Sequence, residues 1–294
     1  MAANKAFTLI LVAHSALIAC SAVTIAAGGR IVLGSNNDNP DSVQLVIAPA
    51  RDGFFGRICI ARETVPGWVP FALRCMNDQG LALTMASVPH DKIPNDPDKP
   101  MFRHNFLEKI AADSATVKQV VSMVRSYSLS QEVNVHIMVA DRTGDSAVIE
   151  WADNEVRVLP RSGGFQVMTN SFLSKTDGAQ NPKTRLARGN STAAAASDAS
   201  IGSVASVLKE MTVHAMYKGE EIQTNESVAW DLSGRKIAIY YKRDFDHPVL
   251  LDFDAEMAKG ARAVDLSRLC PRPVPFESGW RAEYGPYEPK PAPR

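Results

Sequence analysis

Residues 19–40 read Ala19-Cys20-Ser21-Ala22-Val23-Thr24-Ile25-Ala26-Ala27-Gly28-Gly29-Arg30-Ile31-Val32-Leu33-Gly34-Ser35-Asn36-Asn37-Asp38-Asn39-Pro40. Two strand-like runs flank the pair Gly28-Gly29, the pattern of a β-hairpin closed by a two-residue turn. A cysteine stands before the first run, and a polar Asn-Asn-Asp cluster ends the second. Because the two strands of a hairpin lie side by side, we expect Asp38 to return to the neighbourhood of Cys20.

The segment before the hairpin predicts an export signal. Residues 1–19 hold one positive charge, Lys5, followed by a short apolar run that ends at Ala19. A membrane-spanning helix needs about 20 apolar residues, so this run is too short to span a bilayer. We therefore expect an exported protein, periplasmic or extracellular, from which residues 1–19 are removed.

Cys20 has two interpretations. A cut before Cys20 would leave a free N-terminus that carries both a thiol and an α-amine, and Cys20 would then be a catalytic nucleophile. The segment Leu17-Ile18-Ala19-Cys20 also resembles a bacterial lipoprotein box, in which the cysteine is lipidated. In that case Cys20 would be an inert anchor, and the chain would meet a membrane only through its lipid.

The composition indicates one globular domain. The chain has 294 residues, of which 45% are hydrophobic, enough for a large buried core. We expect a single domain over residues 20–294, with a proline-rich tail at about 271–294. Lys+Arg and Asp+Glu both number 32, so the basic excess that is typical of nucleic-acid-binding proteins is absent. We expect no nucleic-acid partner.

The cysteines and histidines predict no metal site. The four cysteines form no CxxC pair, and the six histidines form no HExxH motif. Cys59 and Cys75 fall in neighbouring strand-like runs, which is compatible with a disulfide in an oxidising compartment and equally with two buried free thiols. No cofactor is implied.

The rest of the chain comes in blocks of strands and blocks of helices. Period-two runs predict strands at 43–48, 56–61, 71–76, 81–88, 133–140, 147–151, 156–159, 165–169, 228–232 and 236–241. Helical spacing predicts helices within 101–127, interrupted at 113–116, then from Thr184 and over 201–211. Such blocks favour an α+β fold with two antiparallel sheets between helical layers. The loops 89–100 and 174–183 are expected near one sheet end, where sites are often built.

An N-terminal cysteine suits amide hydrolysis. The reaction needs a nucleophile, a base, donors for the oxyanion and an acid for the leaving amine. The Cys20 thiol would be the nucleophile, and its α-amine, with a pKa of about 7.7–8.0, is matched to proton transfer near neutral pH. Asp38 would orient that amine.

Four further polar residues are candidates for the same site. Asn170 follows an apolar strand, and its side-chain amide suits an oxyanion hole. Arg185 and Arg188 lie one turn apart on one helix face, where one of them would polarise the site. Ser87 lies late in the strand predicted at 81–88, two residues before Pro89, so its hydroxyl or its backbone would face a substrate. Each also fits an ordinary structural role, as a turn cap, part of a solvated helix face or a strand end.

Taken together, these residues resemble the choloylglycine hydrolase and penicillin V acylase family of N-terminal-nucleophile hydrolases. The resemblance covers Cys20 to about Lys242. It implies a four-layer αββα sandwich with Cys20 as the nucleophile, Asp38 on its amine, Asn170 at the oxyanion and Arg185 organising the site. The motifs that carry it, in the family's order, are Gly34-Ser35-Asn36-Asn37-Asp38, Met76-Asn77-Asp78-Gln79-Gly80-Leu81-Ala82, Asp141-Arg142-Thr143-Gly144-Asp145-Ser146 with Glu150, Thr169-Asn170-Ser171 and Thr184-Arg185-Leu186-Ala187-Arg188.

The chain also departs from this family. Ser35 stands where the family has an arginine beside the thiol, and Arg185 or Arg188 would have to compensate. Ser87 stands where bile-salt hydrolases place a second oxyanion asparagine, so that contact is either made by the backbone or missing. The segment Asn36-Asn37-Asp38-Asn39-Pro40 is also similar to the Asn-x-Asp-x-Pro of related secreted dipeptidases.

The sequence therefore predicts an exported cysteine amidohydrolase that cleaves the linear, non-peptide amide C–N bond of a small N-acyl substrate. Two alternatives remain open. One is a secreted dipeptidase-like hydrolase, and the other is a catalytically inert, lipid-anchored binding protein of the same fold. A homo-oligomer is compatible with the resemblance.

Overall fold

The computed structural model describes residues 20–38, 43–62, 70–102, 105–131, 133–175, 184–217 and 220–270. The predicted export signal and the proline-rich tail lie outside these residues, so both stay predictions. Among the described residues, no helix combines the length and the apolar character needed to cross a membrane.

Strands make up much of the described chain. They are β1 (Ser21–Ala27), β2 (Arg30–Asn37), β3 (Val43–Ala48), β4 (Arg57–Arg62), β5 (Phe71–Asn77), β6 (Leu81–Ser87), β7 (Val135–Asp141), β8 (Ser146–Ala152), β9 (Glu155–Pro160), β10 (Phe165–Met168), β11 (His214–Tyr217), β12 (Glu220–Gln223), β13 (Glu226–Asp231), β14 (Lys236–Tyr241), β15 (Val249–Asp252) and β16 (Arg262–Asp265). The helices are α1 (Phe106–Asp113), α2 (Val117–Ser126), α3 (Arg185–Ala194), α4 (Ile201–Glu210), α5 (Phe253–Ala258) and α6 (Leu266–Leu269), with a 3₁₀ helix at Leu173–Lys175.

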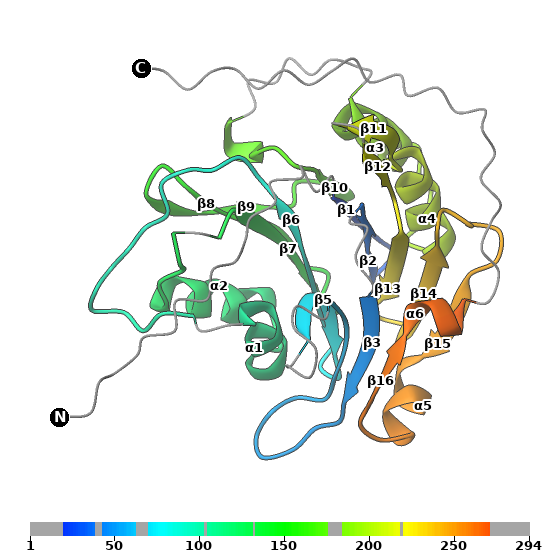
Figure 1. Ribbon diagram of the computed structural model, residues 1–294, viewed down its shortest axis with the longest axis horizontal. Helices are drawn as coiled ribbons and strands as arrows, with labels where there is room; N and C mark the ends of the chain where they lie inside the picture. The colour runs from blue at the N-terminus through cyan, green and yellow to red at the C-terminus, as the bar shows by residue number, and fades with distance from the viewer. Residues whose placement is uncertain are drawn as a thin grey trace.

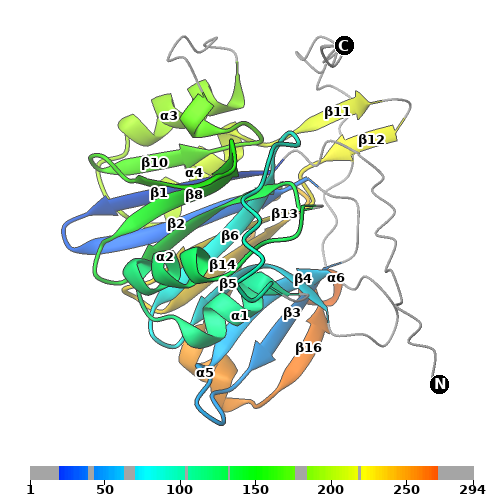
Figure 2. The same cartoon turned by 90° about the vertical axis from the view of Figure 1, so that its left-hand side faces the viewer.

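Most strands belong to two antiparallel sheets. The six-stranded sheet has the order β10-β1-β2-β13-β14-β15, and the eight-stranded sheet has the order β16-β3-β4-β5-β6-β7-β8-β9. The hairpin β11–β12 is separate and projects beyond the two sheets (Figure 2). Because β1 pairs with both β10 and β2, and β2 pairs with β13, the six-stranded sheet brings together segments that are far apart in the sequence.

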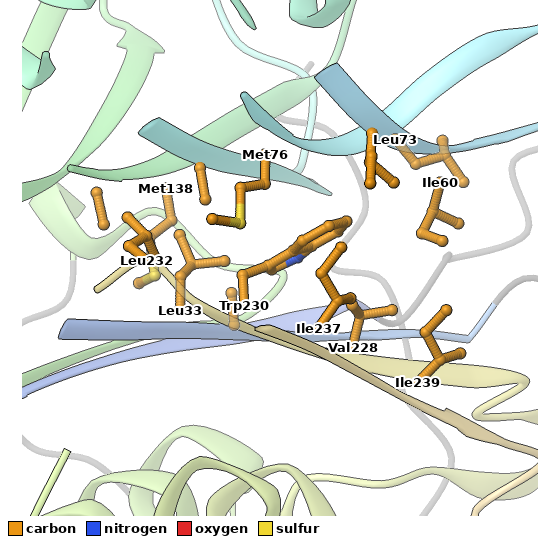
Figure 3. Close-up of a cluster of buried hydrophobic side chains, with 14 of the residues drawn as sticks. Leu33, Ile60, Leu73, Met76, Met138, Val228, Trp230, Leu232, Ile237 and Ile239 are labelled. Atoms are coloured by element: carbon orange, nitrogen blue, oxygen red, sulfur yellow. The ribbon is translucent and has the colours of Figure 1, made fainter. Parts of the chain in front are cut away.

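The two sheets pack face to face, with helices on both outer faces (Figure 1). Side chains of α1 and α2 pack on the eight-stranded sheet, and side chains of α3 and α4 pack on the six-stranded sheet. The layer between the sheets holds apolar side chains from both, with the fully buried Trp230 among them (Figure 3). This is the four-layer αββα sandwich, so the predicted fold is confirmed.

The β1–β2 hairpin forms as predicted. Gly28 and Gly29 have φ angles of 58° and 74°, left-handed values that glycine adopts without strain. Gly34 is needed for a different reason. A Cβ atom there would lie 2.3 Å from Cγ1 of Val204, so α4 packs directly on the backbone of β2.

The predicted interruption within residues 101–127 is confirmed. Helix α1 ends at Asp113 and α2 begins at Val117, where Thr116 caps the first turn. The carboxylate of Asp141 accepts a hydrogen bond from the backbone N–H of Val117 at 2.7 Å. The start of α2 is therefore tied to the end of β7.

Cys59 and Cys75 lie directly opposite each other on β4 and β5 and are joined by a disulfide, with their Cα atoms 4.1 Å apart. Of the two predicted possibilities, the structure therefore has the bridge. It lies in the apolar layer beneath α1 and α2.

The sequence missed several short elements. The hairpin β11–β12 and the elements from β15 to α6 were not predicted, and β16 adds an edge strand by pairing with β3. Some bounds also differ: the strands predicted at 56–61 and 133–140 are Arg57–Arg62 and Val135–Asp141. The helix predicted over 201–211 ends at Glu210.

The two loops expected near one sheet end do meet where both are described. The ammonium group of Lys175 forms ion pairs with Asp91 and Asp153, the second at 2.8 Å. The rest of the predicted loop 174–183, from 176 onward, lies outside the described residues.

Candidate active site

Cys20 lies immediately before β1, at one end of the six-stranded sheet. The register of the hairpin pairs Ser21 with Asn36, so Cys20 stands opposite Asn37. The Sγ atom of Cys20 lies 3.8 Å from Oδ1 of Asn37, and the residue is 6% exposed. The hairpin thus brings the polar cluster at the end of β2 back to the thiol.

Asp38 is a buried carboxylate held by two donors. Nη1 of Arg185 donates to its Oδ2 at 2.9 Å, and the hydroxyl of Thr224 donates to its Oδ1. Thr224 comes just before β13, whose Glu226 pairs with Asn37 of β2. The pairing of β13 with β2 is therefore what carries the Thr224 hydroxyl to Asp38.

Arg185 joins Asp38 to Asn170. It is the first residue of α3, because Thr184 caps that helix with its side chain. Nη2 of Arg185 donates to Oδ1 of Asn170 at 2.6 Å, while Nη1 holds Asp38. Nδ2 of Asn170 in turn donates to the backbone carbonyl of Ser87 at 2.8 Å. The contacts of both amide atoms fix the orientation of the Asn170 side chain.

These contacts form one continuous chain beside Cys20. Its members come from the end of β2, the start of α3, the loop after β10 and the end of β6. The structure therefore brings together five of the six residues named from the sequence: Cys20, Asp38, Asn170, Arg185 and, through its backbone oxygen, Ser87.

The sixth residue, Arg188, has a different placement. It lies one turn further along α3, and its Nε donates to the backbone carbonyl of Glu210 at 3.0 Å. Glu210 is the last residue of α4. This contact joins the two helices that cover the six-stranded sheet.

Burial dominates the chemistry of the thiol. Burial raises the pKa of Cys20 to about 11, and the negative charge of Asp38 acts in the same direction. The positive charge of Arg74, the backbone N–H of Asp38 and the positive charge of Arg185 oppose the rise. In this form of the chain residues 1–19 precede Cys20, so its nitrogen is a peptide nitrogen and not an amine.

Two carboxyl groups near the thiol also have raised pKa values. Burial raises the pKa of Asp38 to about 6 against the opposing charge of Arg185. Burial raises the pKa of Glu226 to about 7 against Arg74, and the negative charge of Asp38 adds to the rise. Titratable groups with strongly shifted pKa values cluster at functional sites.

A buried pair in the eight-stranded sheet supports the loop that carries Asn170. Nε2 of His136 donates to the backbone carbonyl of Thr169 at 2.7 Å, and Nδ1 lies 3.2 Å from Oε1 of Glu150. The same carboxylate oxygen accepts the backbone N–H of Leu173 at 2.6 Å. The loop is therefore anchored on both sides of Asn170.

Four residues around the thiol were not predicted: Asn37, Arg74, Thr224 and Glu226. Arg74 had a readable signal, because it is the one charged residue in the apolar strand β5 and a buried charge needs a partner. Thr224 and Glu226 had no local signal, since they reach the site only through the pairing of β13 with β2.

The arrangement holds the groups that an acyl-transfer site uses. A cysteine, a carboxylate, a guanidinium group and a side-chain amide lie in one connected cluster, partly shielded from water. Within the part of the chain that the structure describes, no group of three or more His, Cys, Asp and Glu side chains is placed to hold a metal ion.

A family model matches the central part of the chain. The model of the linear amide C-N hydrolases, choloylglycine hydrolase family, matches residues 36–175. The matched range includes Asp38, Arg74 and Asn170, and it leaves out Cys20 and Arg185. Curated protein sequences contain no match to the chain.

Two solved structures share the fold. A mutant of the conjugated bile acid hydrolase from Clostridium perfringens has 15% sequence identity and a TM-score of 0.65, over 83% of this chain and 96% of that chain. Penicillin V acylase from Agrobacterium tumefaciens has 17% identity and a TM-score of 0.61, over 79% of this chain and 84% of that chain. In fold over most of its length, and in sequence over residues 36–175, the chain resembles the choloylglycine hydrolase and penicillin V acylase family, which confirms the predicted resemblance.

Proposed function

We propose that the mature chain begins at Cys20 and is a cysteine amidohydrolase that cleaves the linear amide C–N bond of a small N-acyl substrate. The observation that carries the proposal is the chain of contacts from Asp38 through Arg185 to Asn170 beside a buried cysteine. The match to a family of linear amide hydrolases supports it.

The first step of the proposed reaction is attack by the thiol. Removal of residues 1–19 converts the nitrogen of Cys20 into an α-amine, which takes the proton of the thiol. The sulfur then forms a bond to the carbonyl carbon, and the carbonyl oxygen becomes an oxyanion. Asp38 holds and orients the ammonium group, whose positive charge also favours the thiolate.

The second step releases the amine. The oxyanion collapses, the C–N bond breaks, and the ammonium group returns its proton to the leaving nitrogen, which leaves a thioester on Cys20. Water then attacks the thioester and releases the acid and the free thiol. Nδ2 of Asn170 is the proposed donor to the oxyanion in both halves, and Arg185 keeps that amide in place through Oδ1.

The proposal is tested by comparing Cys20→Ala with Cys270→Ala, because these are the two free cysteines of the described chain and both are buried. Both variants and the wild type are assayed on penicillin V, bile-salt conjugates, N-acyl homoserine lactones, N-acylethanolamines and dipeptides. We expect Cys20→Ala to lose all turnover and Cys270→Ala to keep it. Full turnover in Cys20→Ala would contradict the mechanism, and cleavage of dipeptides alone would favour the dipeptidase alternative.

Export and maturation are part of the proposal and have their own measurement. The intact mass of the chain isolated from its native host is expected to correspond to an N-terminus at Cys20 with an unmodified amine. A diacylglyceryl adduct on Cys20 would instead support the inert, lipid-anchored alternative.

A further inference from the structure

Arg74 is a buried positive charge contributed by the sheet opposite Cys20. It lies in β5 two residues before Met76, so both side chains point into the layer between the sheets, where Figure 3 shows Met76. Its side chain is 1% exposed, and Nη1 lies 3.2 Å from Oε1 of Glu226, which is 0% exposed. Glu226 belongs to β13 of the six-stranded sheet, so this ion pair crosses from one sheet to the other.

The pair continues to the thiol. Nδ2 of Asn37 donates to Oε2 of Glu226 at 3.0 Å, and Oδ1 of Asn37 lies 3.8 Å from Sγ of Cys20. Asn37 is the residue opposite Glu226 in the register of β2 and β13. One line of contacts therefore runs from Arg74 through Glu226 and Asn37 to Cys20.

These contacts do not use all of the hydrogen-bond donors of Arg74. Its Nε and Nη1 atoms and Oε1 of Glu226 are buried without a hydrogen-bond partner among the described residues, so the contact between them is an ion pair without hydrogen-bond geometry. A guanidinium group that keeps unused donors in a layer of low dielectric exerts a strong field on nearby charge.

Ser35 faces the same layer. It lies two residues before Asn37 on β2, and alternate residues of a strand share one face. Ser35 is 1% exposed, and its hydroxyl is also buried without a hydrogen-bond partner in the described chain. An arginine at position 35 would place a second guanidinium group in the layer that already holds Arg74, and two such buried cations repel.

We propose that Arg74 takes the place of the arginine missing at position 35, as a positioning residue that reaches the thiol of Cys20 from the opposite sheet and is held there by Glu226. In this chain the positive charge comes from β5 of the eight-stranded sheet, whereas an arginine at position 35 would supply it from β2 of the six-stranded sheet. Both positions face the same buried layer. The sequence offered Arg185 or Arg188 as the compensating residue, but Arg185 is engaged by Asp38 and Asn170, and Arg188 contacts the carbonyl of Glu210. The proposal rests on the proposed function, in which Cys20 must form a thiolate.

The electrostatic balance at Cys20 agrees with this assignment. Among the groups that oppose the burial-raised pKa of the thiol, Arg74 contributes more than Arg185. Among the described residues, the charged and titratable groups that act on Cys20 are Asp38 after β2, Arg74 on β5, Arg185 on α3 and, through Asn37, Glu226 on β13.

The test measures the thiol directly, without turnover. The mature chain is treated with iodoacetamide between pH 6 and 10, and the alkylation of Cys20 and of Cys270 is followed separately by peptide mass spectrometry. In Arg74→Met we expect Cys20 to react about tenfold more slowly at pH 8, because losing a nearby positive charge raises a thiol pKa by about one unit or more. Cys270 serves as the internal reference and keeps its rate.

A second variant guards against loss of folding. Removing one partner of a buried ion pair is destabilising, so Arg74→Met is also combined with Glu226→Gln, which leaves no unpaired buried charge. Adding Ser35→Arg to this double variant should restore the alkylation rate of Cys20. The matched control is Arg57→Met, which breaks the 2.5 Å ion pair with Glu108 on the outer side of the same sheet and should leave Cys20 unchanged.

Two results would overturn the proposal. One is an unchanged alkylation rate of Cys20 in folded Arg74→Met and in the double variant. The other is a slowed rate that Ser35→Arg does not restore. Failure of the proposed function would look different: Cys20 would respond to Arg74 as expected, and yet no amide of the panel would be cleaved.

Discussion

Two free cysteines, Cys20 and Cys270, are both buried in the described structure, and burial raises the pKa of each to about 11. Their surroundings differ. At Cys20, Arg74 and Arg185 oppose the effect of burial, whereas at Cys270 the negative charge of Asp244 adds to it. Burial alone makes a thiol unreactive, because only the thiolate is a nucleophile.

The comparison shows what distinguishes a site from a buried side chain. Cations reach Cys20 from a facing strand and from a helix, and a carboxylate beside it is held by two donors. Cys20 is also the first residue of the proposed mature chain, and Cys270 is not. Its own ammonium group would therefore add a further positive charge beside the thiol.

Among the variants that keep Cys20, the largest effect is expected for Asp38→Asn. Turnover should fall by about 100- to 10,000-fold, the range that general acid–base catalysis contributes, because the ammonium group loses its counter-charge in proton transfer. The Cys20 thiol should nevertheless be alkylated faster, because the negative charge of Asp38 that raises its pKa is gone. In the wild type, turnover should decline as the pH falls through about 6, where Asp38 becomes protonated.

The matched control for that variant is Asp244→Asn. It should speed the alkylation of Cys270, because the charge of Asp244 raises that thiol's pKa, and leave turnover unchanged. Slower alkylation of Cys20 in Asp38→Asn would contradict the electrostatic account.

A somewhat smaller effect is expected for Asn170→Ala. Loss of an oxyanion donor lowers kcat by about 100- to 1,000-fold. KM should change little, and the alkylation rates of Cys20 and Cys270 should stay as in the wild type, because no charge is removed. Asn190→Ala, on the same helix as Arg185, is the control with full kcat. An unchanged kcat in Asn170→Ala would remove this residue from the oxyanion role.

Glu226→Gln should change how stability depends on pH. Burial raises the pKa of Glu226 from 4.5 to about 7, so between these values the folded chain keeps a proton that the unfolded chain has lost. This contribution to stability is complete below about 4.5 and is lost as the pH rises through about 7. Melting temperatures of both proteins are measured from pH 4 to 8. The difference between them, variant minus wild type, should increase as the pH rises, because only the wild type loses this contribution.

The control for the stability measurement is Glu155→Gln, because the Glu155 side chain is 69% exposed at the start of β9. Its melting temperature should track that of the wild type at every pH. A pH-independent difference between Glu226→Gln and the wild type would show that Glu226 titrates in the same range folded and unfolded.

The smallest effect is expected for Ser87→Ala. Asn170 contacts the backbone oxygen of Ser87, and that oxygen is kept in the variant. Turnover should change by less than about twofold, which is about 0.4 kcal/mol in activation free energy, because the contact with Asn170 is not lost. A loss of tenfold or more would assign a role to the hydroxyl.

A feature could be predicted from the sequence when the residues that specify it are close together in the chain. The hairpin around Gly28-Gly29 and the interruption before Val117 are written in neighbouring residues, and the structure has both. The short elements near the end of the chain, such as β16, have too few residues for a period to be visible.

The site divides in the same way. Asp38, Asn170 and Arg185 could be named because each lies in a short motif with a family counterpart. Arg74 and Glu226 could not be paired, because their contact joins different sheets and depends on how the two sheets pack. Ser35 indicated that the family's positive charge beside the thiol was missing, but it did not indicate which strand or residue would supply that charge instead.

The position of Cys20 bears on whether the chain must be cut before it can fold. Pairing in the hairpin begins at Ser21, one residue after Cys20. A cut before Cys20 would therefore leave every described strand intact. On the proposed maturation, we expect the described sandwich to fold before or after the cut, so an uncut precursor would be a folded zymogen that lacks the α-amine of Cys20.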